Sequence, residues 1–248
     1  MSSTRFQDRT VIVTGAGSGI GRATAVQLAE ESARVIGVDV SRSRLRSLEE
    51  ELGDAVLTVD GDLTDQITID RVLAHADSSV HGLANIAGIM DGFEPTAEIK
   101  DETWDRVLAV NLTAMMRLTR AVLPLMISAG GGSIVNVSSE AGLRGSAAGT
   151  PYTTSKHAVN GFTLSTAFFY TPHGVRCNAV APGPVATNIE APFRSEMAQR
   201  RLGPIMQATL PEIANADAPA AAIIWLLSDE ASDVSGAIIP VDGGWAAI

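Results

Sequence analysis

Short runs of apolar, often β-branched residues alternate along the chain with longer segments in which apolar residues recur at helical spacing. The short runs are typical of strands buried on both faces of a parallel sheet, and the longer segments of helices that cover it. Together they predict an α/β fold, a doubly wound parallel sheet of about seven strands with helices on both faces. The predicted strands cover residues 10–14, 33–38, 55–60, 81–86, 132–138, 175–180 and 236–241. The predicted helices cover residues 19–32, 42–51, 65–78, 101–129, 152–171 and 215–228.

Residues suited to ligand binding follow the predicted strands. In open α/β sheets, ligands bind beyond the carboxyl ends of the strands. The residues at or just after these ends are Gly15, Asp39, Asp62, Asn85, Ser139 and Pro182. The pattern therefore predicts one binding site at this edge of the sheet. A length of 248 residues is consistent with a single domain over residues 1–248.

The first predicted strand runs directly into a glycine-rich turn. The strand Thr10–Thr14 is followed by Gly15-Ala-Gly-Ser-Gly-Ile-Gly21 and then by a segment of good helix formers. Glycine lets the backbone turn tightly and approach a pyrophosphate, and the N-terminus of the next helix offers free N–H groups and a partial positive charge. Strand, glycine turn and helix in this order predict a Rossmann-like dinucleotide site. A flexible surface loop is the alternative.

An acidic residue ends the second predicted strand. Asp39 is placed to hydrogen-bond the ribose hydroxyls of an adenosine and to repel a 2′-phosphate. The glycine turn holds no Arg or Lys, although Arg42 and Arg44 follow in the next turn or helix and would favour NADP. Because the acid stands at the strand tip, we expect NAD as the cofactor and NADP as the less favoured one.

Tyr152 and Lys156 form a candidate acid–base pair. On a helix, residues four apart lie on the same face. An ammonium beside a phenol favours the phenolate, so we expect the pKa of Tyr152 to fall from about 10 towards neutrality. A phenol with such a pKa can donate or accept a proton, and Ser139, at the end of a separate strand, can hold the oxygen involved. By itself the Tyr-x-x-x-Lys spacing also fits a solvated helix face.

Eight short segments occur in order, at spacings that suit one nucleotide-binding domain. They are TGAGSGIG (14–21), GDL (61–63), NIAG (85–88), Asn111 in AVNLT, VNVSS (135–139), YTTSK (152–156), APGPVAT (181–187) and VDGG (241–244). In this order they resemble the motifs of the classical short-chain dehydrogenase/reductase (SDR) family. One departure is Ile86, where the family more often has a second Asn, and this position falls on a structural segment. The resemblance covers nearly the whole chain and implies a nicotinamide-dependent oxidoreductase.

The resemblance also implies a role for each catalytic residue. Tyr152 is expected to be the general acid in ketone reduction and the general base in alcohol oxidation. Ser139 is expected to hydrogen-bond the substrate oxygen. Lys156 is expected to hold the nicotinamide ribose and to lower the pKa of Tyr152, and Asn111 to carry a water relay. An ordinary polar helix residue is the alternative for Asn111, although Asn is mildly unfavourable inside a helix.

The cofactor contacts follow from the same resemblance. Asp62 and Leu63 are expected beside the adenine ring, and the backbone after Pro182 together with Thr187 beside the carboxamide. Asp62 can instead cap the next helix, and Pro182 can simply end a strand. The expected cofactor-binding residues are Gly15, Ser18, Gly19, Ile20, Asp39, Asp62, Leu63, Asn85, Ala87, Gly88, Tyr152, Lys156, Pro182, Gly183, Val185 and Thr187.

The substrate end of the site is expected under a small lid at about residues 188–212. Methionine side chains adapt to varied shapes and would suit an apolar pocket there. Basic side chains in the same segment can meet an anionic substrate or lie on a solvated helix face. The apolar candidates are Phe193, Met197, Ile205 and Met206, and the basic ones are Arg194, Arg200 and Arg201.

Composition narrows the class of protein. A net charge of −10 argues against binding to nucleic acid or to an anionic membrane surface. Cys177 is the only cysteine, so an intrachain disulfide and a cysteine-rich metal site are excluded, and a buried structural role is expected. No run reaches the roughly 18 uninterrupted apolar residues of a membrane span, and no basic and apolar leader begins the chain. We expect a cytoplasmic protein, and the family resemblance implies a homotetramer.

These features predict an oxidoreductase that transfers a hydride between NAD and a small-molecule secondary alcohol or ketone, with Tyr152 as general acid and base. Two alternatives stay open. The first is reduction of a 3-oxoacyl thioester on an acyl carrier protein with NADPH, against which Asp39 counts. The second is a non-catalytic sensor or scaffold that binds nucleotide, against which the complete catalytic set counts.

Overall fold

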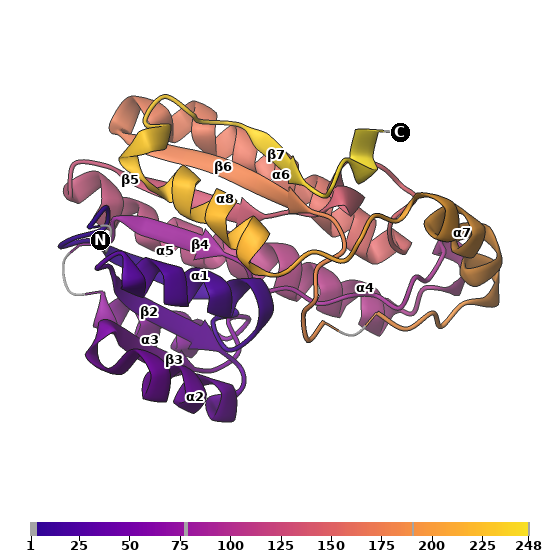
Figure 1. Ribbon diagram of the computed structural model, residues 1–248, viewed down its shortest axis with the longest axis horizontal. Helices are drawn as coiled ribbons and strands as arrows, with labels where there is room; N and C mark the ends of the chain where they lie inside the picture. Colours follow the sequence, from indigo (N-terminus) through magenta and orange to yellow (C-terminus); the bar gives the residue numbers. More distant parts are fainter. Residues whose placement is uncertain (1–3, 77–78, 190, 248) are drawn as a thin grey trace.

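The computed structural model describes residues 4–76, 79–189 and 191–247, and at its centre is a seven-stranded parallel sheet (Figure 1). The strand order is β3-β2-β1-β4-β5-β6-β7, so the predicted doubly wound fold is confirmed. The chain builds outward from β1 to β3 and then returns to place β4 beside β1. The strands are β1 (Thr10–Thr14), β2 (Arg34–Asp39), β3 (Val56–Asp60), β4 (Gly82–Asn85), β5 (Gly132–Val137), β6 (Val175–Pro182) and β7 (Ile238–Val241).

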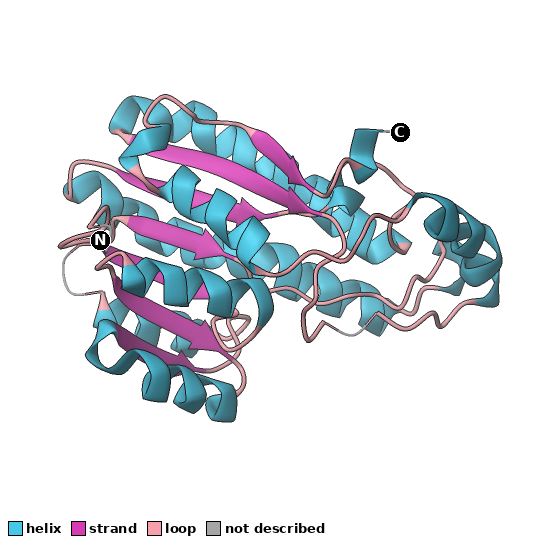
Figure 2. Ribbon diagram, viewed as in Figure 1, coloured by secondary structure: helices cyan, strands magenta, loops and turns pink. Residues whose placement is uncertain are grey.

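Helices cover both faces of the sheet (Figure 2). One face carries α1 (Gly19–Glu30), α2 (Arg42–Leu52) and α8 (Asp217–Leu227), and the other carries α3 (Gln66–His75), α5 (Met115–Ser128) and α6 (Thr150–Tyr170). The chain enters α5 from α4 (Asp101–Leu108), and α7 (Glu196–Thr209) lies beyond the carboxyl ends of the strands, at the right of Figure 1. Short 3-10 turns occupy Gly53–Ala55, Thr96–Glu98, Glu140–Gly142, Thr171–His173, Asp229–Ala231 and Trp245–Ala247.

The central strands separate two apolar cores. Val11 and Val13 of β1 belong to the core that includes Leu28 of α1. Ile12 between them belongs to the opposite core, with Val122 of α5. A strand that is buried on both faces can be apolar at every position, which is why these strands appear in the sequence as unbroken apolar runs.

Element positions agree with the prediction except at two places. Every strand end lies within two residues of its predicted position, and the last part of the predicted helix 65–78, at residues 77–78, lies outside the described residues. The predicted helix 101–129 is interrupted by a π-helical turn at Ala109–Ala114. Helix α7 was not predicted, because Gly203 and Pro204 weaken its helical signal.

The helical run Asp101–Ser128 is long enough to cross a membrane and contains an 18-residue window with a mean hydropathy of 1.2. On one of its faces Leu118, Val122 and Met126 are fully buried in the core beside the sheet. A core helix of this length passes the same test of length and composition. The packing against the sheet therefore accounts for the apolar residues on this face of the run.

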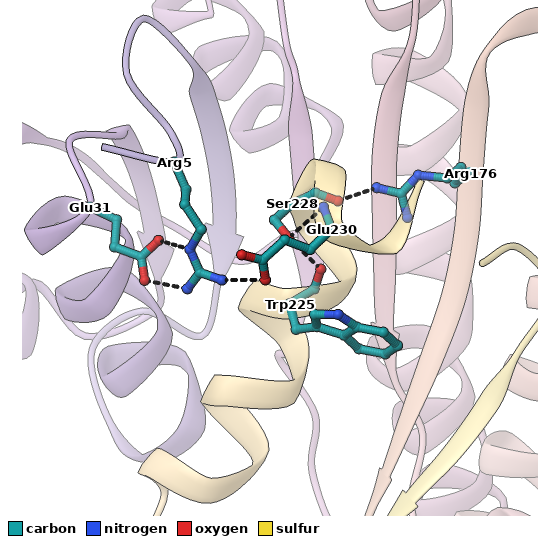
Figure 3. Close-up of polar contacts among 6 residues, drawn as sticks. All are labelled: Arg5, Glu31, Arg176, Trp225, Ser228 and Glu230. Atoms are coloured by element: carbon teal, nitrogen blue, oxygen red, sulfur yellow. Dashed lines mark hydrogen bonds and ion pairs between the residues drawn. The ribbon is translucent and has the colours of Figure 1, made fainter. Parts of the chain in front are cut away.

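Ion pairs tie the N-terminal segment to α1 and to the turn after α8 (Figure 3). Arg5 donates to both carboxylate oxygens of Glu31, at 2.6 and 2.5 Å. The same guanidinium donates to Glu230 at 2.9 Å. Two segments that are far apart in the sequence are thus joined at the end of the sheet opposite α7.

We predict that Arg176→Met destabilises the fold. Arg176 of β6 is partly buried and donates to the carbonyl oxygens of Leu226 and Ser228, at 2.8 and 2.9 Å, where α8 ends. A helix leaves its last carbonyl groups without donors, so losing this guanidinium should lower the free energy of unfolding by about 1–3 kcal/mol. Urea unfolding followed by circular dichroism measures the change. Arg200→Met, at an exposed position of α7, should change it by less than about 0.5 kcal/mol, and equal effects of the two substitutions would contradict the prediction.

Candidate active site

A cavity of about 820 Å³ opens at the carboxyl ends of the strands. The glycine turn and the end of β2 form one end of it, α6 lines its middle, and the lid segment lines the other end. The fold brings every residue predicted for catalysis or cofactor binding to this one cavity, whereas their individual roles stay predictions. These lining residues are Gly15, Ser18, Gly19, Ile20, Asp39, Asp62, Leu63, Asn85, Ala87, Gly88, Asn111, Ser139, Tyr152, Lys156, Pro182, Gly183, Val185 and Thr187.

The turn after β1 requires glycine. Gly15 has a φ of +69°, and a Cβ at this position would lie 3.2 Å from the Cα of Ala87. At Gly21 a Cβ would lie 2.1 Å from the carbonyl oxygen of Gly15, so any side chain there would break the turn. Ser18 precedes α1 without making a side-chain capping bond, and the first turn of α1 holds no acidic residue. The partial positive charge of this helix end is therefore left for an anion.

Thr14 joins the ends of β1 and β4 beneath the glycine turn. Its hydroxyl oxygen accepts hydrogen bonds from the backbone N–H groups of Ile86 and Ala87, at 2.8 and 3.0 Å. The hydroxyl lies 3.4 Å from the carbonyl oxygen of Ala84, to which it donates. Because the contact at Ile86 is made by its backbone, the side chain at this position is free to pack against the core.

Asp39 lies at the carboxyl end of β2 with 8% of its surface exposed. Its carboxylate accepts from the backbone N–H groups of Gly17 and Ser41, at 3.0 and 2.9 Å. Arg44 of α2 pairs with the same carboxylate at 3.2 Å and also lines the cavity. The acid is thus held beside the glycine turn, and a guanidinium shares this end of the cavity with it.

Two residues predicted to contact the cofactor have protein partners of their own. Asp62 accepts from the backbone N–H and the hydroxyl of Thr64, at 2.9 and 2.8 Å, and pairs with Arg106 at 2.9 Å. Asn85 donates to Asn136 of β5 at 2.9 Å. Asp62 does not cap the next helix, which begins at Gln66 after Asp65, and makes a local turn with Thr64 instead. The amide of Asn85 bridges two strands, and both residues still line the cavity.

Helix α6 carries Tyr152 and Lys156 one turn apart. The helix begins at Thr150, so Tyr152 lies in its first turn. The Nζ atom of Lys156 lies 5.4 Å from the centre of the Tyr152 ring and donates to the carbonyl oxygen of Val137 at 2.8 Å. Ser139, two residues after β5, lines the same cavity and lies close enough to the phenol to lower its pKa. The three side chains that the sequence separates are therefore neighbours.

Burial shifts both ionisable groups away from their charged forms. Burial raises the pKa of Tyr152 to about 12, the hydrogen bond from Ser139 lowers that pKa, and the negative charge of Asp91 raises it further. Burial also lowers the pKa of Lys156 to about 8. The expectation that Lys156 brings the pKa of Tyr152 towards neutrality is wrong for the chain without cofactor, because desolvation outweighs the other contributions.

Asn111 lies in the π-helical turn between α4 and α5. Its side chain accepts from the N–H of Ile89 at 2.8 Å and donates to the carbonyl oxygen of the same residue at 2.9 Å. It also lies 3.2 Å from the hydroxyl of Ser155 on α6. A Cβ on Gly88 would lie 3.3 Å from the Asn111 amide oxygen and 3.5 Å from the Nζ of Lys156. Asn111 thus locks the segment after β4 to α6, beyond what an ordinary polar helix residue does, and π-turns are frequent at functional sites.

The far end of the cavity is lined mainly by apolar side chains. Met90 and Phe93 follow β4, and Trp245 comes from the C-terminal turn. Sequence reasoning missed all three, because no local pattern separates them from core residues. The ring of Phe93 stacks on Phe193 of the lid, with centroids 4.2 Å apart. Further apolar residues at this end are Ile189, Ala191, Met206, Leu210 and Ile213.

Only some of the lid residues that were predicted to line the substrate pocket lie at the cavity. Met206 lines the cavity, and Phe193 reaches it through Phe93, whereas Met197 is 61% exposed and Ile205 does not line it. Of the three lid arginines only Arg194 lines the cavity. The other apolar and basic candidates lie on faces of α7 that the sequence pattern alone does not distinguish.

Trp245 holds the C-terminal turn against the lid. Its indole N–H donates to the hydroxyl of Thr209 in α7 at 3.1 Å. The guanidinium of Arg144 lies over the indole ring, 4.9 Å from its centre. Arg144 is itself paired with Glu140, a buried carboxylate directly after Ser139. The turn Trp245–Ala247 is therefore held against the lid at the apolar end of the cavity.

A family model described as short chain dehydrogenase matches residues 9–198. The chain belongs to the short-chain dehydrogenase family. Members of this family are oxidoreductases that use a nicotinamide cofactor and act on small molecules. The chain is 40% identical over 258 aligned residues to the short-chain dehydrogenase/reductase cdmF of Talaromyces verruculosus, and the match covers 98% of this chain and 99% of that protein.

Solved structures of other short-chain dehydrogenases are similar along almost the whole chain. Levodione reductase is 33% identical, with a TM-score of 0.86 and coverage of 98% of this chain and 99% of that one. A short chain dehydrogenase from Mycobacterium paratuberculosis, solved with bound NAD, is 28% identical, with a TM-score of 0.90 and coverage of 98% and 100%.

The residues of this dehydrogenase fit the cofactor that its family uses. Gly19 has a φ of +50°, and a Cβ there would lie 2.8 Å from the side chain of Thr187. The glycine turn therefore packs closely against the segment after β6 and leaves its backbone, rather than side chains, to face the cavity. With the free helix end of α1 and the buried carboxylate of Asp39, this arrangement suits a dinucleotide.

We predict that Lys156→Met changes the pH dependence of stability in the cofactor-free protein. The pKa of Lys156 is about 8 in the folded chain, against 10.5 for an unperturbed lysine. The burial penalty on the ammonium is therefore fully present below pH 8 and is relieved as the pH rises towards 10.5. The stability gained by Lys156→Met over the wild type should fall, by on the order of 3 kcal/mol, between pH 7 and pH 10.5.

Urea unfolding at a series of pH values measures this difference. Lys100→Met is the matched control, because Lys100 is exposed at the start of α4 and is the only other lysine. Its substitution, at this exposed position, should change stability by less than about 0.5 kcal/mol. A Lys156→Met difference that is independent of pH would show that the ammonium is not penalised by burial.

Proposed function

We propose that this dehydrogenase interconverts a secondary alcohol and a ketone with NAD, and that Tyr152 is its general acid and base. One observation carries the proposal. Tyr152, Lys156 and Ser139 meet at the middle of a cavity whose one end is a glycine turn with an acidic neighbour. Its other end is mainly apolar. Cofactor, proton transfer and substrate thus each have a place along a single cavity.

The cofactor end is formed by residues that bind through their backbone as much as through side chains. The turn from Gly15 to Gly21 and the end of α1 would hold the pyrophosphate, and Asp39 the adenosine ribose. Lys156 would hold the nicotinamide ribose, and Thr187 the carboxamide. When bound, the nicotinamide accepts a hydride in alcohol oxidation and gives one up in ketone reduction.

The proton chemistry belongs to the protein. With a pKa of about 12, Tyr152 is neutral, which is the form that donates a proton to a ketone oxygen. In alcohol oxidation the phenol must first lose its proton, and the nearest positive charge that favours this loss is the ammonium of Lys156. Ser139 donates to the substrate oxygen and keeps it within reach of the phenol.

NAD is the proposed cofactor because Asp39 is buried at the place where an adenosine ribose would lie. A 2′-phosphate there would meet this carboxylate at close range. Arg44 is the residue that would favour NADP, but its guanidinium is engaged by the same carboxylate at 3.2 Å. The similar dehydrogenase from Mycobacterium paratuberculosis was solved with NAD, which is consistent with this choice.

The proposed substrate is apolar around its reacting carbon. Met90, Phe93 and Trp245 line the end of the cavity beyond Tyr152. Burying an apolar group against such a wall gains about 25 cal/mol for each Å² removed from water. Arg194 lines the same end, so an acceptor group remote from the reacting carbon can be accommodated as well.

We predict that Tyr152→Phe loses turnover while the protein stays folded and binds NAD. Removing one positioned acid–base group typically lowers the rate by about 10²–10⁴-fold. Nicotinamide absorbance, followed with a panel of apolar secondary alcohols and ketones, measures the loss. Tyr170→Phe is the control, because Tyr170 is the only other tyrosine and lies at the far end of the same helix. A Tyr152→Phe protein with near-native turnover would sink the mechanism.

We predict that Asp39→Ala weakens NAD and improves NADP relative to it. The substitution removes the acceptor for the ribose and the charge that repels a 2′-phosphate, and it frees Arg44. The ratio of kcat/KM for NAD over NADP should fall by at least about 10-fold, equivalent to 1.4 kcal/mol. Asp60→Asn is the control, because Asp60 stands in register with Asp39 on β3 but does not line the cavity. An unchanged ratio would mean that Asp39 does not select the cofactor.

A further inference from the structure

A second buried carboxylate lies beside the proposed catalytic residues without taking part in the chemistry described so far. Asp91 follows β4 and is 1% exposed. One of its oxygens accepts from the backbone N–H of Tyr152 and the other from the backbone N–H of Phe93, both at 2.9 Å. A single side chain therefore binds the backbone of the proposed proton donor and the backbone of a residue in the substrate wall.

At Tyr152 the carboxylate replaces a helix cap. The residue before α6, Gly149, has no side chain to cap the helix, and a helix begins with N–H groups that lack partners within it. The N–H of Thr150 donates to the carbonyl oxygen of Glu94 and Pro151 has no N–H, so Asp91 supplies the acceptor for the next one, that of Tyr152, from a different segment of the chain. A Cβ at Gly149 would lie 2.5 Å from the Asp91 oxygen, so glycine is what allows this approach. The first turn of the catalytic helix is thus fixed by Asp91.

At Phe93 the carboxylate holds a strained turn. Gly92 and Phe93 have φ values of +73° and +61°, and the second is an unfavourable conformation for a residue with a side chain. The bond from the Phe93 N–H to Asp91 stabilises this conformation. It points the Phe93 ring onto Phe193 of the lid. The same carboxylate therefore places a wall of the substrate end.

The charge of Asp91 also reaches the phenol. Three groups face Tyr152 from the elements packed around it. Lys156 lies on its own helix, Ser139 follows β5, and Asp91 follows β4. Glu140, next to Ser139, is neutralised by its pair with Arg144. A negative charge near a phenol disfavours the phenolate, and Asp91 acts on Tyr152 in this direction.

We propose that Asp91 is a positioning residue that sets the catalytic phenol and the substrate wall relative to each other through its two backbone hydrogen bonds. The proposal rests on the proposed function of Tyr152 as general acid and base. It goes beyond that function, because it assigns to one carboxylate both the geometry of proton transfer and the protonation balance of the phenol.

Asp91→Asn tests the proposal, since it keeps the shape of the side chain but removes its charge and one of its two acceptor oxygens. In alcohol oxidation the rate rises as Tyr152 loses its proton, so kcat reaches a plateau at high pH. The plateau should fall by about 10- to 100-fold, because small displacements of reacting groups have effects of this size. The midpoint of the pH profile should move to lower pH, since the charge that raises the pKa of Tyr152 is gone.

KM for NAD should stay within about twofold of the wild type, because the cofactor end of the cavity is untouched.

Glu94→Gln is the matched control. Glu94 lies three residues further along the same segment, is buried, and its side chain does not line the cavity. It should leave both the plateau and the midpoint unchanged, even if it alters thermal stability.

An Asp91→Asn protein with the wild-type plateau and midpoint would reduce Asp91 to a structural cap and overturn the proposal. If Asp91→Asn does not fold, Asp91→Glu keeps the charge at a wrong distance and should lower the plateau; a wild-type plateau would overturn the proposal equally.

A measurement without substrate separates this proposal from the proposed function. In a Tyr170→Phe background Tyr152 is the only tyrosine, so near-ultraviolet absorbance reports the ionisation of its phenol alone. Addition of Asp91→Asn should make that phenol ionise at lower pH than in the Tyr170→Phe protein. We expect this shift whether or not the protein turns over an alcohol or a ketone. Absence of turnover would contradict the proposed function but not the proposal for Asp91. An unshifted titration would overturn the proposal for Asp91 whatever the activity.

Discussion

The site depends on one join in the sheet, between β1 and β4. The chain moves outward from β1 to β3 and returns before β4 begins, so the loops after β1 and β4 diverge and leave a crevice at the carboxyl ends of the strands. The hydroxyl of Thr14 closes the base of this crevice by binding the backbone of Ile86 and Ala87. Gly15 follows directly on one side and Gly88 on the other. The glycine turn and the segment that leads to Gly88 are therefore joined at their base by a single side chain.

The parts of the site that sequence could predict are those that depend on local structure. The glycine turn and Asp39 follow strands that are marked by apolar runs, and parallel strands bring their carboxyl ends to one edge whatever else the fold does. Tyr152 and Lys156 need only a helix between them to be neighbours. For these residues, correct prediction of the strands and helices was enough to predict which residues lie together, because the regular geometry of each element fixes where they lie.

The parts that sequence could not predict depend on contacts between distant segments. The π-turn at Asn111 arises where its amide binds Ile89, and nothing in the local pattern marks the extra residue in the helix. Asp91 looks like any loop carboxylate until α6 is seen to begin beside it. Trp245 joins the cavity only because the chain end returns to the lid. The protonation of Tyr152 was predicted with the wrong sign for the chain without cofactor, because spacing reports a neighbouring charge but not the loss of solvent.

Burial of Tyr152 and Lys156 has two opposite effects on the proposed chemistry. It disfavours the charged forms of both Tyr152 and Lys156, so the phenolate and the ammonium that the proposed alcohol oxidation would use both carry a desolvation penalty in the cavity without cofactor. Yet the same low polarity strengthens every interaction between charges once both are formed. The phenolate therefore needs a partner held in place, and the Nζ of Lys156 is held by the carbonyl of Val137 rather than by the phenol. Burial thus keeps Tyr152 a neutral phenol but only lowers the pKa of Lys156 to about 8, so the proposed proton transfer would take place beside an ammonium that is still charged at neutral pH.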